Sequence, residues 1–351
     1  MLAAVFKSTG APLVVEQVAD PVPQQNELVI AVGACGICGT DLHWTENRDT
    51  SGGWRELTPG GILGHEFAGE ITEVGANAKS QFRVGDIVCA LPFIGCGRCA
   101  ACLSGRVFRC ASVDTRATPT LAGAYAQYAR VGVAETVRLP AGMDVQLGAL
   151  IEPLAVGLAA AERAQFSPGA SVLVMGAGPV GLSVAMWCRF LGAGHVIVSD
   201  RVYDRASRAA EFGATDMIDA AREPVTERLQ AIAGGAPQVV FDCVGVAGTM
   251  QSAVEYVAND GCVVVAGLCM GADQFLPAVA VVKAIDLRFT MCYEKRHFEV
   301  IVDLIARGRI DVSRFITQTV SFAGFAEKFE QLKTAGADIK VLLQPHSACG
   351  H

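Results

Sequence analysis

The stretch that most restricts the fold is an uncharged, mostly apolar run with a glycine-rich centre, from Ser171 to Cys188. Ser171–Met175 is typical of a buried strand and Val180–Leu191 of a helix, with Gly176-Ala-Gly178-Pro179-Val180-Gly181 at their junction. The first glycine permits a tight turn, the second lets a pyrophosphate approach the backbone, and the third allows close helix–strand packing. Unpaired N–H groups at the helix start favour phosphate. The run therefore predicts a dinucleotide site rather than a membrane span.

Strands and helices alternate through the central part of the chain. The sequence predicts further strands over His195–Ser199, Val239–Asp242 and Cys262–Ala266, and helices over Tyr203–Phe212 and Gly248–Val257. Such alternation favours a parallel, doubly wound sheet of the Rossmann type.

The flanking parts have a different pattern. The first 150 residues indicate short strands between glycine and proline residues, over Leu28–Ala34, Phe67–Val74 and Asp86–Leu91. The last part predicts helices over Phe298–Arg307 and Phe325–Thr334 and a strand over Lys340–Leu343. We expect an α/β protein with a β-rich domain at 1–152, an inserted nucleotide domain at 153–290, and a return at 291–351 that completes the first domain.

Asp200 bears on which dinucleotide binds. It ends the strand after the glycine-rich helix, at the spacing where a carboxylate accepts from the ribose 2′-hydroxyl. A 2′-phosphate would be repelled there, so the sequence favours NAD over NADP. Arg201 and Arg205 follow directly and leave NADP open, because an arginine can pair with that phosphate.

Four cysteines lie close together at Cys96, Cys99, Cys102 and Cys110. Their spacing, C-x2-C-x2-C-x7-C, allows four thiolates to close a tetrahedron around zinc with no position left for substrate. An iron–sulfur cluster also uses four cysteines, but the compact loop favours zinc. We therefore predict a structural zinc site.

A second set of metal-binding residue types is spread along the chain. Cys38, Thr40, Asp41 and His43 fall within one short segment, His65 and Glu66 are adjacent, and Glu152 precedes the nucleotide domain. Mixed thiolate, imidazole and carboxylate ligands are typical of a catalytic zinc, which keeps one position for water or substrate. Each residue alone is weak evidence, since a lone cysteine or histidine is more often part of a core.

Composition narrows the function classes. The net charge of −7 and the lack of a lysine- or arginine-rich run argue against nucleic-acid and membrane-surface partners. Met1–Lys7 contains no basic region followed by a long apolar run, so we expect no secretory signal. The odd number of cysteines, 13, favours reduced thiols and zinc over disulfides. A cytoplasmic location is predicted.

In combination, these motifs resemble the zinc-dependent medium-chain dehydrogenase/reductase family over nearly the whole chain. Within it the chain is most similar to the 2,3-butanediol, sorbitol and threonine dehydrogenase branch. The matching motifs are Gly36-Ile-Cys38-Gly-Thr40-Asp41, Gly64-His65-Glu66, Gly85-Asp86, the four cysteines, Glu152-Pro153-Leu154, Gly176–Gly181 and Lys340-Val-Leu-Leu. The resemblance implies a GroES-like catalytic domain, a Rossmann domain, and a homo-oligomer, with a tetramer favoured and a dimer possible.

The resemblance also implies roles for single residues. Cys38 and His65 would bind the catalytic zinc, and Glu66 and Glu152 compete for the third protein position. Thr40 would take the substrate proton and pass it, through the ribose, to His43, whose ordinary pKa suits a relay near neutral pH. Asp41 would orient a ligand, and Lys340 would meet the cofactor pyrophosphate. Val244 and Gly267 are also assigned to the cofactor site.

The implied reaction is reversible hydride transfer between an alcohol and NAD. Zinc lowers the pKa of the bound alcohol, so that an alkoxide forms near neutral pH. Polyol members of the family would carry a basic residue before a tyrosine, where this chain has Cys292 before Tyr293. With aromatic Trp44, Trp54 and Phe93 near the expected pocket, the sequence favours a secondary alcohol or vicinal diol over a polyol or threonine.

The same residues argue against two other classes of protein. A zinc-free quinone or enoyl reductase on the same fold would lack the four cysteines and the Cys38 and His65 ligands. A zinc-stabilised binding protein that has lost the chemistry would show damage at Cys38, Thr40, His65 or the glycine loop, and none is visible in the sequence.

Overall fold

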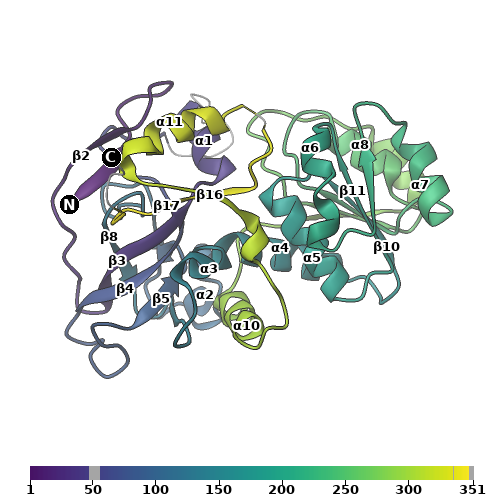
Figure 1. The fold of residues 1–351 in the computed structure, drawn as a ribbon. Helices are drawn as coiled ribbons and strands as arrows, with labels where there is room; N and C mark the ends of the chain where they lie inside the picture. The colour runs from purple at the N-terminus through teal and green to yellow at the C-terminus, as the bar shows by residue number, and fades with distance from the viewer. Residues whose placement is uncertain (47–55, 335, 348–351) are drawn as a thin grey trace. The chain divides into compact units, whose positions relative to one another are not determined.

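The computed structural model describes residues 1–46, 56–334 and 336–347, which form two compact units (Figure 1). Among these, unit 1 takes in residues of 1–152, 293–334 and 340–347, and unit 2 takes in 153–292 and 336–339. Trp54, expected near the pocket, lies outside the described residues.

Unit 1 consists mainly of strands joined by short helices. Its strands are β1 (Leu2–Val5), β2 (Val14–Gln17), β3 (Glu27–Gly36), β4 (Glu66–Val74), β5 (Ile87–Ala90), β6 (Phe93–Ile94), β7 (Asp114–Thr115), β8 (Tyr128–Gly132), β9 (Thr136–Arg138), β16 (Ile316–Val320) and β17 (Lys340–Leu343). Its helices are α1 (Gly39–Glu46), α2 (Ala100–Leu103), α3 (Val145–Ala149), α10 (Lys295–Ala306) and α11 (Phe322–Leu332), with 3-10 turns η1 (Val107–Arg109) and η3 (Ser313–Phe315).

The main sheet of unit 1 is organised around β3. The strand order is β16-β17-β3-β4-β5-β9, and β8 also pairs with β3. Antiparallel pairing places Gly36, the last residue of β3, opposite Glu66 of β4 and opposite Leu342 of β17. The register therefore brings three segments, far apart in sequence, to one end of the sheet.

Aromatic rings fill the core of unit 1 between the sheet and α11. Phe67, Tyr125, Phe325 and Phe329 are each no more than 1% exposed. The ring of Tyr125 lies 4.9 Å from that of Phe325 and 6.1 Å from that of Phe329. Because each aromatic ring buries a large apolar area, this packing fixes α11 and Tyr125 against the sheet.

Unit 2 is a parallel sheet with helices on both faces. Its strands are β10 (Ser171–Met175), β11 (His195–Asp200), β12 (Asp216–Asp219), β13 (Val239–Asp242), β14 (Cys262–Val265) and β15 (Asp286–Phe289). Its helices are α4 (Ile151–Ala164), whose first residues belong to unit 1, α5 (Pro179–Phe190), α6 (Tyr203–Ala206), α7 (Val225–Ala233), α8 (Thr249–Tyr256) and α9 (Pro277–Lys283), with the 3-10 turn η2 (Ala209–Phe212).

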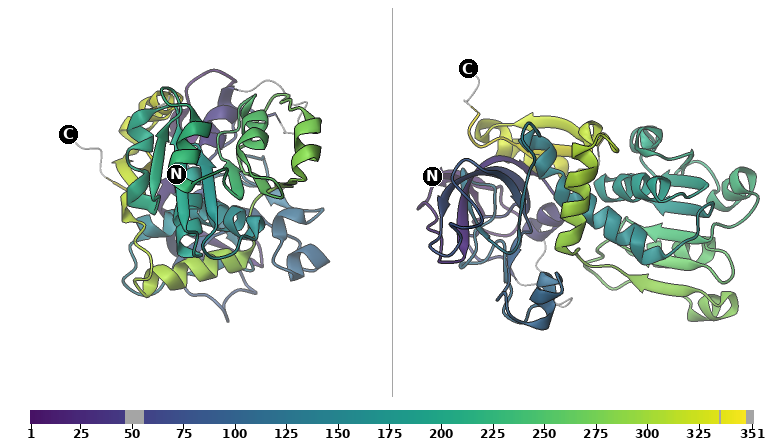
Figure 2. Two further views of the ribbon diagram at one scale, coloured as in Figure 1. Left: turned by 90° about the vertical axis from the view of Figure 1, so that its right-hand side faces the viewer. Right: turned by 90° about the horizontal axis from the view of Figure 1, so that it is seen from below.

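The strand order of this sheet is β12-β11-β10-β13-β14-β15, with parallel pairing throughout. Figures 1 and 2 show α5 and α6 on one face and α7 and α8 on the other. Helices on both faces exclude water from the central strand, and Val172, Leu173 and Val174 of β10 are fully buried. This explains the continuous apolar run that predicted the strand. The predicted Rossmann fold class is confirmed.

One helix differs from the prediction. The expected single helix over Tyr203–Phe212 is wrong, because α6 ends at Ala206 and the 3-10 turn η2 continues from Ala209. Gly213, at φ +86°, closes the turn in the left-handed conformation that favours glycine.

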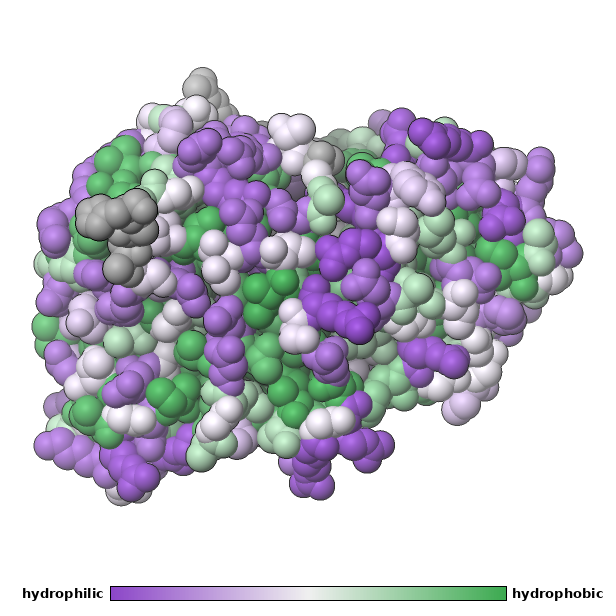
Figure 3. Space-filling model, viewed as in Figure 1, coloured by the Kyte–Doolittle hydropathy of each residue, from purple (hydrophilic) through white to green (hydrophobic). Residues whose placement is uncertain are grey.

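Figure 3 shows hydrophilic and apolar residues interspersed on the visible face of each unit. Within the described residues, no helix is both long and apolar enough to span a bilayer.

Candidate metal centres and cofactor loop

The four predicted structural ligands meet in one loop of unit 1. The Sγ atoms of Cys96, Cys99, Cys102 and Cys110 all lie within 4.8 Å of one another. The loop folds back through α2 and η1, and the amide of Cys96 donates to Sγ of Cys110 over 3.5 Å. Hydrogen bonds from the amides of Arg98 and Cys99 lower the pKa of the Cys96 thiol to about 6. Four sulfurs at this separation fit a closed tetrahedral metal site.

The second predicted set converges at the end of the main sheet. Cys38 follows β3, and His65 directly precedes β4, so the pairing of Gly36 with Glu66 brings them together. One ligand atom each from Cys38, His65 and Glu66 lies within 4.8 Å of the other two. These donors fit a zinc ion, and a set of three protein ligands leaves a fourth position open. Glu152 is not a member of this three-residue set.

His65 is oriented by a pair of residues behind it. Its Nδ1 lies 3.2 Å from Oδ1 of Asp41, and the hydroxyl of Tyr125 donates to Oδ2 of Asp41 over 2.6 Å. Burial alone would lower the pKa of His65, but Asp41 and Cys38 raise it well above its usual value. With Nδ1 held by Asp41, Nε2 is the ring nitrogen left for a metal ion. The sequence analysis missed Tyr125, which lies 84 residues from Asp41 along the chain.

Lys340 forms a buried ion pair with Glu66. Its Nζ lies 2.7 Å from each carboxylate oxygen of Glu66, although only Oε1 accepts with hydrogen-bond geometry. Nζ also donates to the carbonyl of Ile37, and the lysine side chain is only 2% exposed. The buried ammonium contacts Glu66 and Ile37 in this structure, and the contact with a cofactor pyrophosphate stays a prediction.

Gly36 explains how the Glu66–Lys340 pair fits into the sheet. A Cβ atom added at Gly36 would overlap Oε2 of Glu66 and approach Cδ of Lys340 to 3.1 Å. The glycine therefore leaves room for the ion pair at the strand end. Oε2 of Glu66 is buried without a hydrogen-bond partner, which leaves that oxygen for a metal ion.

Glu152 lies on the first turn of α4 and is buried. The hydroxyl of Tyr293 donates to Oε1 of Glu152. Tyr293 directly precedes Glu294, the N-cap residue of α10. Burial and the nearby Glu66 raise the pKa of Glu152 to about 7, against the opposing effects of His65, Tyr293 and Lys340. Glu152 is therefore within electrostatic range of the Cys38–His65–Glu66 set.

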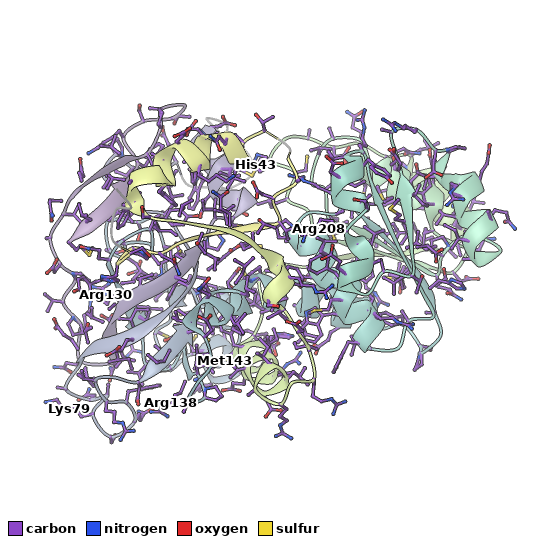
Figure 4. All side chains as sticks on the ribbon, in the orientation of Figure 1. His43, Lys79, Arg130, Arg138, Met143 and Arg208 are labelled. Atoms are coloured by element: carbon purple, nitrogen blue, oxygen red, sulfur yellow. The ribbon has the colours of Figure 1, made fainter. Side chains whose placement is uncertain are left out.

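Thr40 and His43 lie three residues apart on α1, so both side chains lie on one side of this short helix. Thr40 is half-buried and His43, labelled in Figure 4, is exposed. Trp44 packs against the core of unit 1, and Phe93 is buried beside Tyr293.

The cofactor loop of unit 2 has the geometry that its glycines predict. Gly176 is in the left-handed region at φ +95°, and a Cβ atom at Gly181 would overlap the carbonyl oxygen of Gly176. A Cβ at Gly178 would meet no atom within 4 Å. The loop therefore leaves space at Gly178, where the backbone of the α5 start can receive a phosphate, with Pro179 and Val180 in its first turn.

Asp200 is held at this loop by two backbone donors. Its Oδ2 accepts from the amide of Ala177 and its Oδ1 from the amide of Val202, each over 2.7 Å. Arg201 is exposed, and Nε of Arg205 donates to the carbonyl of Gly336.

Val244 and Gly267 lie beside the same loop. Cγ2 of Val244 would be 3.1 Å from a Cβ at Gly176, and a Cβ at Gly267 would come within 2.9 Å of the Val244 amide nitrogen. The structure thus gathers these two predicted residues at the carboxyl ends of β10 and β13, where open parallel sheets bind ligands.

Family models match both units. Residues 24–141 match the alcohol dehydrogenase GroES-like domain, and residues 179–307 match the zinc-binding dehydrogenase domain. Fold, metal-ligand geometry and family models together define a zinc-type medium-chain dehydrogenase.

Individual relatives extend this match over the full chain. A sorbitol dehydrogenase of Bacillus subtilis (strain 168) is 34% identical, with 93% of each chain covered. A probable D-xylulose reductase A of Arthroderma otae is 33% identical, with 92% of each covered. The structure of a proposed zinc-binding dehydrogenase from Sinorhizobium meliloti 1021, bound to NADP, has a TM-score of 0.86 at 30% identity and covers 98% of this chain and 99% of its own. The chain belongs to the zinc-type alcohol dehydrogenase family and is a zinc-dependent dehydrogenase of alcohols or polyols.

Proposed function

We propose that Cys38, His65 and Glu66 hold the catalytic zinc and that Cys96, Cys99, Cys102 and Cys110 hold a second, structural zinc. The observation that carries the first site is the convergence of a thiolate, an imidazole and a carboxylate within 4.8 Å, beside an unsatisfied oxygen of Glu66. Glu152 is the alternative carboxylate, because it lies within electrostatic range of the three. Metal analysis of the wild type and of Cys38→Ser and Cys99→Ser variants tests this assignment: each variant should lose one zinc.

When bound, zinc supplies a Lewis acid that favours the deprotonated form of the alcohol. The residues of this chain then position the substrate and remove its proton. Thr40 would accept the proton from the alcohol, and exposed His43 would be the last group of the relay, which gives the proton to solvent. His43→Ala should lower turnover most below neutral pH, where solvent hydroxide cannot replace the relay. A uniform loss across the pH range would contradict this role.

The substrate we propose is a secondary alcohol or vicinal diol rather than a sugar polyol. Cys292 stands where a polyol enzyme would carry a basic residue, and the neighbouring Tyr293 stacks on Phe93 in a buried aromatic environment. The names of the sorbitol and xylulose relatives make a polyol the competing candidate. Rates with butane-2,3-diol, cyclohexanol, sorbitol and xylitol decide between them, and much faster oxidation of the polyols would reject the proposal.

The proposed cofactor is NAD. Asp200 supports it, because two backbone donors fix its carboxylate at the glycine loop, where it can accept from a ribose hydroxyl. The NADP in the Sinorhizobium relative and the nearby Arg201 favour the alternative. Asp200→Ala should shift the ratio of kcat/KM for NAD over NADP toward NADP, and an unchanged ratio would refute the role.

A homo-oligomer is also proposed, a tetramer before a dimer. Apolar side chains are exposed along α9 and the edge strand β15, with Val281 76%, Val282 86% and Phe289 61% exposed. An unpaired sheet edge with exposed apolar residues suits a second copy of the same chain. Light scattering of the wild type and of Val282→Glu tests this, since the variant should dissociate. The cytoplasmic location remains a prediction that rests on cysteine usage.

A further inference from the structure

A row of aromatic rings connects the four-cysteine loop with Glu152. Phe108, two residues before Cys110, lies 6.4 Å from the ring of Phe93, three residues before Cys96. Phe93 in turn stacks on Tyr293, with ring centroids 6.2 Å apart and planes 21° apart. The hydroxyl of Tyr293 donates to Glu152. All of these residues belong to unit 1.

Tyr293 is buried and contacts the aromatic rings of Phe93 and Phe298. Tyr293 is 3% exposed, and the centroid of its ring lies 5.2 Å from that of Phe298 in α10. The next helix, α10, is joined to the loop by the amide of Lys295, which donates to the carbonyl of Gly105. Nζ of Lys295 donates to the carbonyl of Ala134, between β8 and β9. Movement of the cysteine loop would therefore move Tyr293.

Contacts within and beside the four-cysteine loop hold it in this position. Glu135 is buried and accepts from the amide of Gly95, next to Cys96, while a Cβ at Gly95 would crowd Sγ of Cys102. Four sulfurs bound to one ion would fix the same short segment that carries Phe93 and Phe108. Loss of that ion would release both rings.

We propose that Tyr293 is a positioning residue through which the four-cysteine loop, by way of Phe93, holds Glu152 at the catalytic metal. The loop then has a role beyond local stability, because it sets the place of the second carboxylate near Cys38, His65 and Glu66. This inference rests on the proposed function, in which Glu152 is the alternative carboxylate at that metal.

The test measures zinc release from the zinc-loaded full-length protein after addition of a chromophoric chelator in excess. The release phase that is absent in Cys38→Ser reports the catalytic metal. Tyr293→Phe removes only the hydroxyl, and Phe93→Leu removes only the stacked ring. Each should speed that phase, and slow turnover of NAD with butane-2,3-diol, by about 10-fold. Phe93→Tyr, which keeps the ring, should restore the wild-type rate.

The double variant Tyr293→Phe/Phe93→Leu distinguishes positioning from general damage. If Phe93 acts through Tyr293, the double variant should release zinc no more than about twofold faster than Tyr293→Phe alone, because coupled residues are not additive. Phe6→Leu, a buried ring in the same unit, serves as the stability control and should leave the release phase unchanged.

Two results would overturn the proposal: effects that multiply in the double variant, or Phe93→Leu behaving like Phe6→Leu. Neither depends on turnover. An inactive wild type would count against the proposed function alone, whereas the release rates would still decide the role of Tyr293.

Discussion

Replacement of Lys340 by an uncharged residue perturbs the metal site without changing any of the proposed metal ligands. In Lys340→Met the carboxylate of Glu66, whose side chain is 1% exposed, loses a cation at 2.7 Å. Loss of one partner of a buried ion pair costs about 3–5 kcal/mol, since a buried charge is left uncompensated. We expect this loss in the metal-free protein.

Bound zinc should reduce that cost, because the ion supplies a positive charge to the same carboxylate. If about 1–2 kcal/mol of destabilisation remains in the zinc-loaded protein, the difference of about 2–3 kcal/mol appears as tighter zinc binding by linkage. This difference corresponds to an affinity about 30- to 150-fold higher. Lys340 would then act as a competitor of the metal for Glu66.

Urea unfolding with and without zinc, together with zinc competition by a chromophoric chelator, measures both quantities. Lys340→Arg keeps the cation and should resemble the wild type. Lys79→Met, at an exposed lysine of the same unit (Figure 4), is the surface control. Weaker zinc binding in Lys340→Met, or greater destabilisation with zinc than without it, would show that Lys340 assists zinc coordination and does not compete with the metal for Glu66.

Three further predictions concern other parts of the chain. Gly181→Ala should weaken NAD binding at least about 100-fold, because its Cβ overlaps the Gly176 carbonyl oxygen; titration of NAD fluorescence quenching, with unchanged zinc content, checks this. The Arg138 guanidinium, labelled in Figure 4, lowers the pKa of Asp86, together with Arg83. Ionised Asp86 therefore stabilises the folded state at pH values above its unfolded pKa, and this stability is lost as the pH falls through its lowered folded pKa. Asp86→Asn should cost up to about 1 kcal/mol of unfolding free energy near pH 7 and nothing in strong acid. Urea unfolding at several pH values measures this difference. Cys99→Ser should lower the melting temperature and the zinc content, and an unchanged melting temperature would argue against a structural metal.

Local sequence patterns predicted the parts of the fold that local physics determines. β10 and β13 match the predicted bounds because short, wholly apolar runs between turn residues are typical of strands buried on both faces. The Cys96–Cys110 spacing likewise predicted a cluster, since four thiols in one loop have few other ways to be used. α4 was not predicted, although its Pro153 lies in the first turn, where a helix tolerates proline.

The contacts at the site that the sequence did not predict depend on pairing between segments far apart in the chain. Lys340 and Glu66 are 274 residues apart, and only the pairing of β17 and β4 with β3 brings them together. Tyr125 reaches Asp41 because the segment after Thr120 hydrogen-bonds to residues 62–64 beside His65. No motif contains both members of either pair, so a single sequence gives no signal for them.

We have proposed that the Cys38–His65–Glu66 site is the metal centre of an NAD-linked alcohol dehydrogenase. The most direct test is NAD reduction across primary alcohols, secondary alcohols, diols, polyols and threonine, measured with zinc-loaded, zinc-stripped and zinc-restored protein. From this proposal we expect activity on one alcohol class that disappears on stripping, returns with zinc, and is absent in Cys38→Ser. Activity that survives the loss of zinc, or silence across the panel with zinc and NAD both bound, would contradict it.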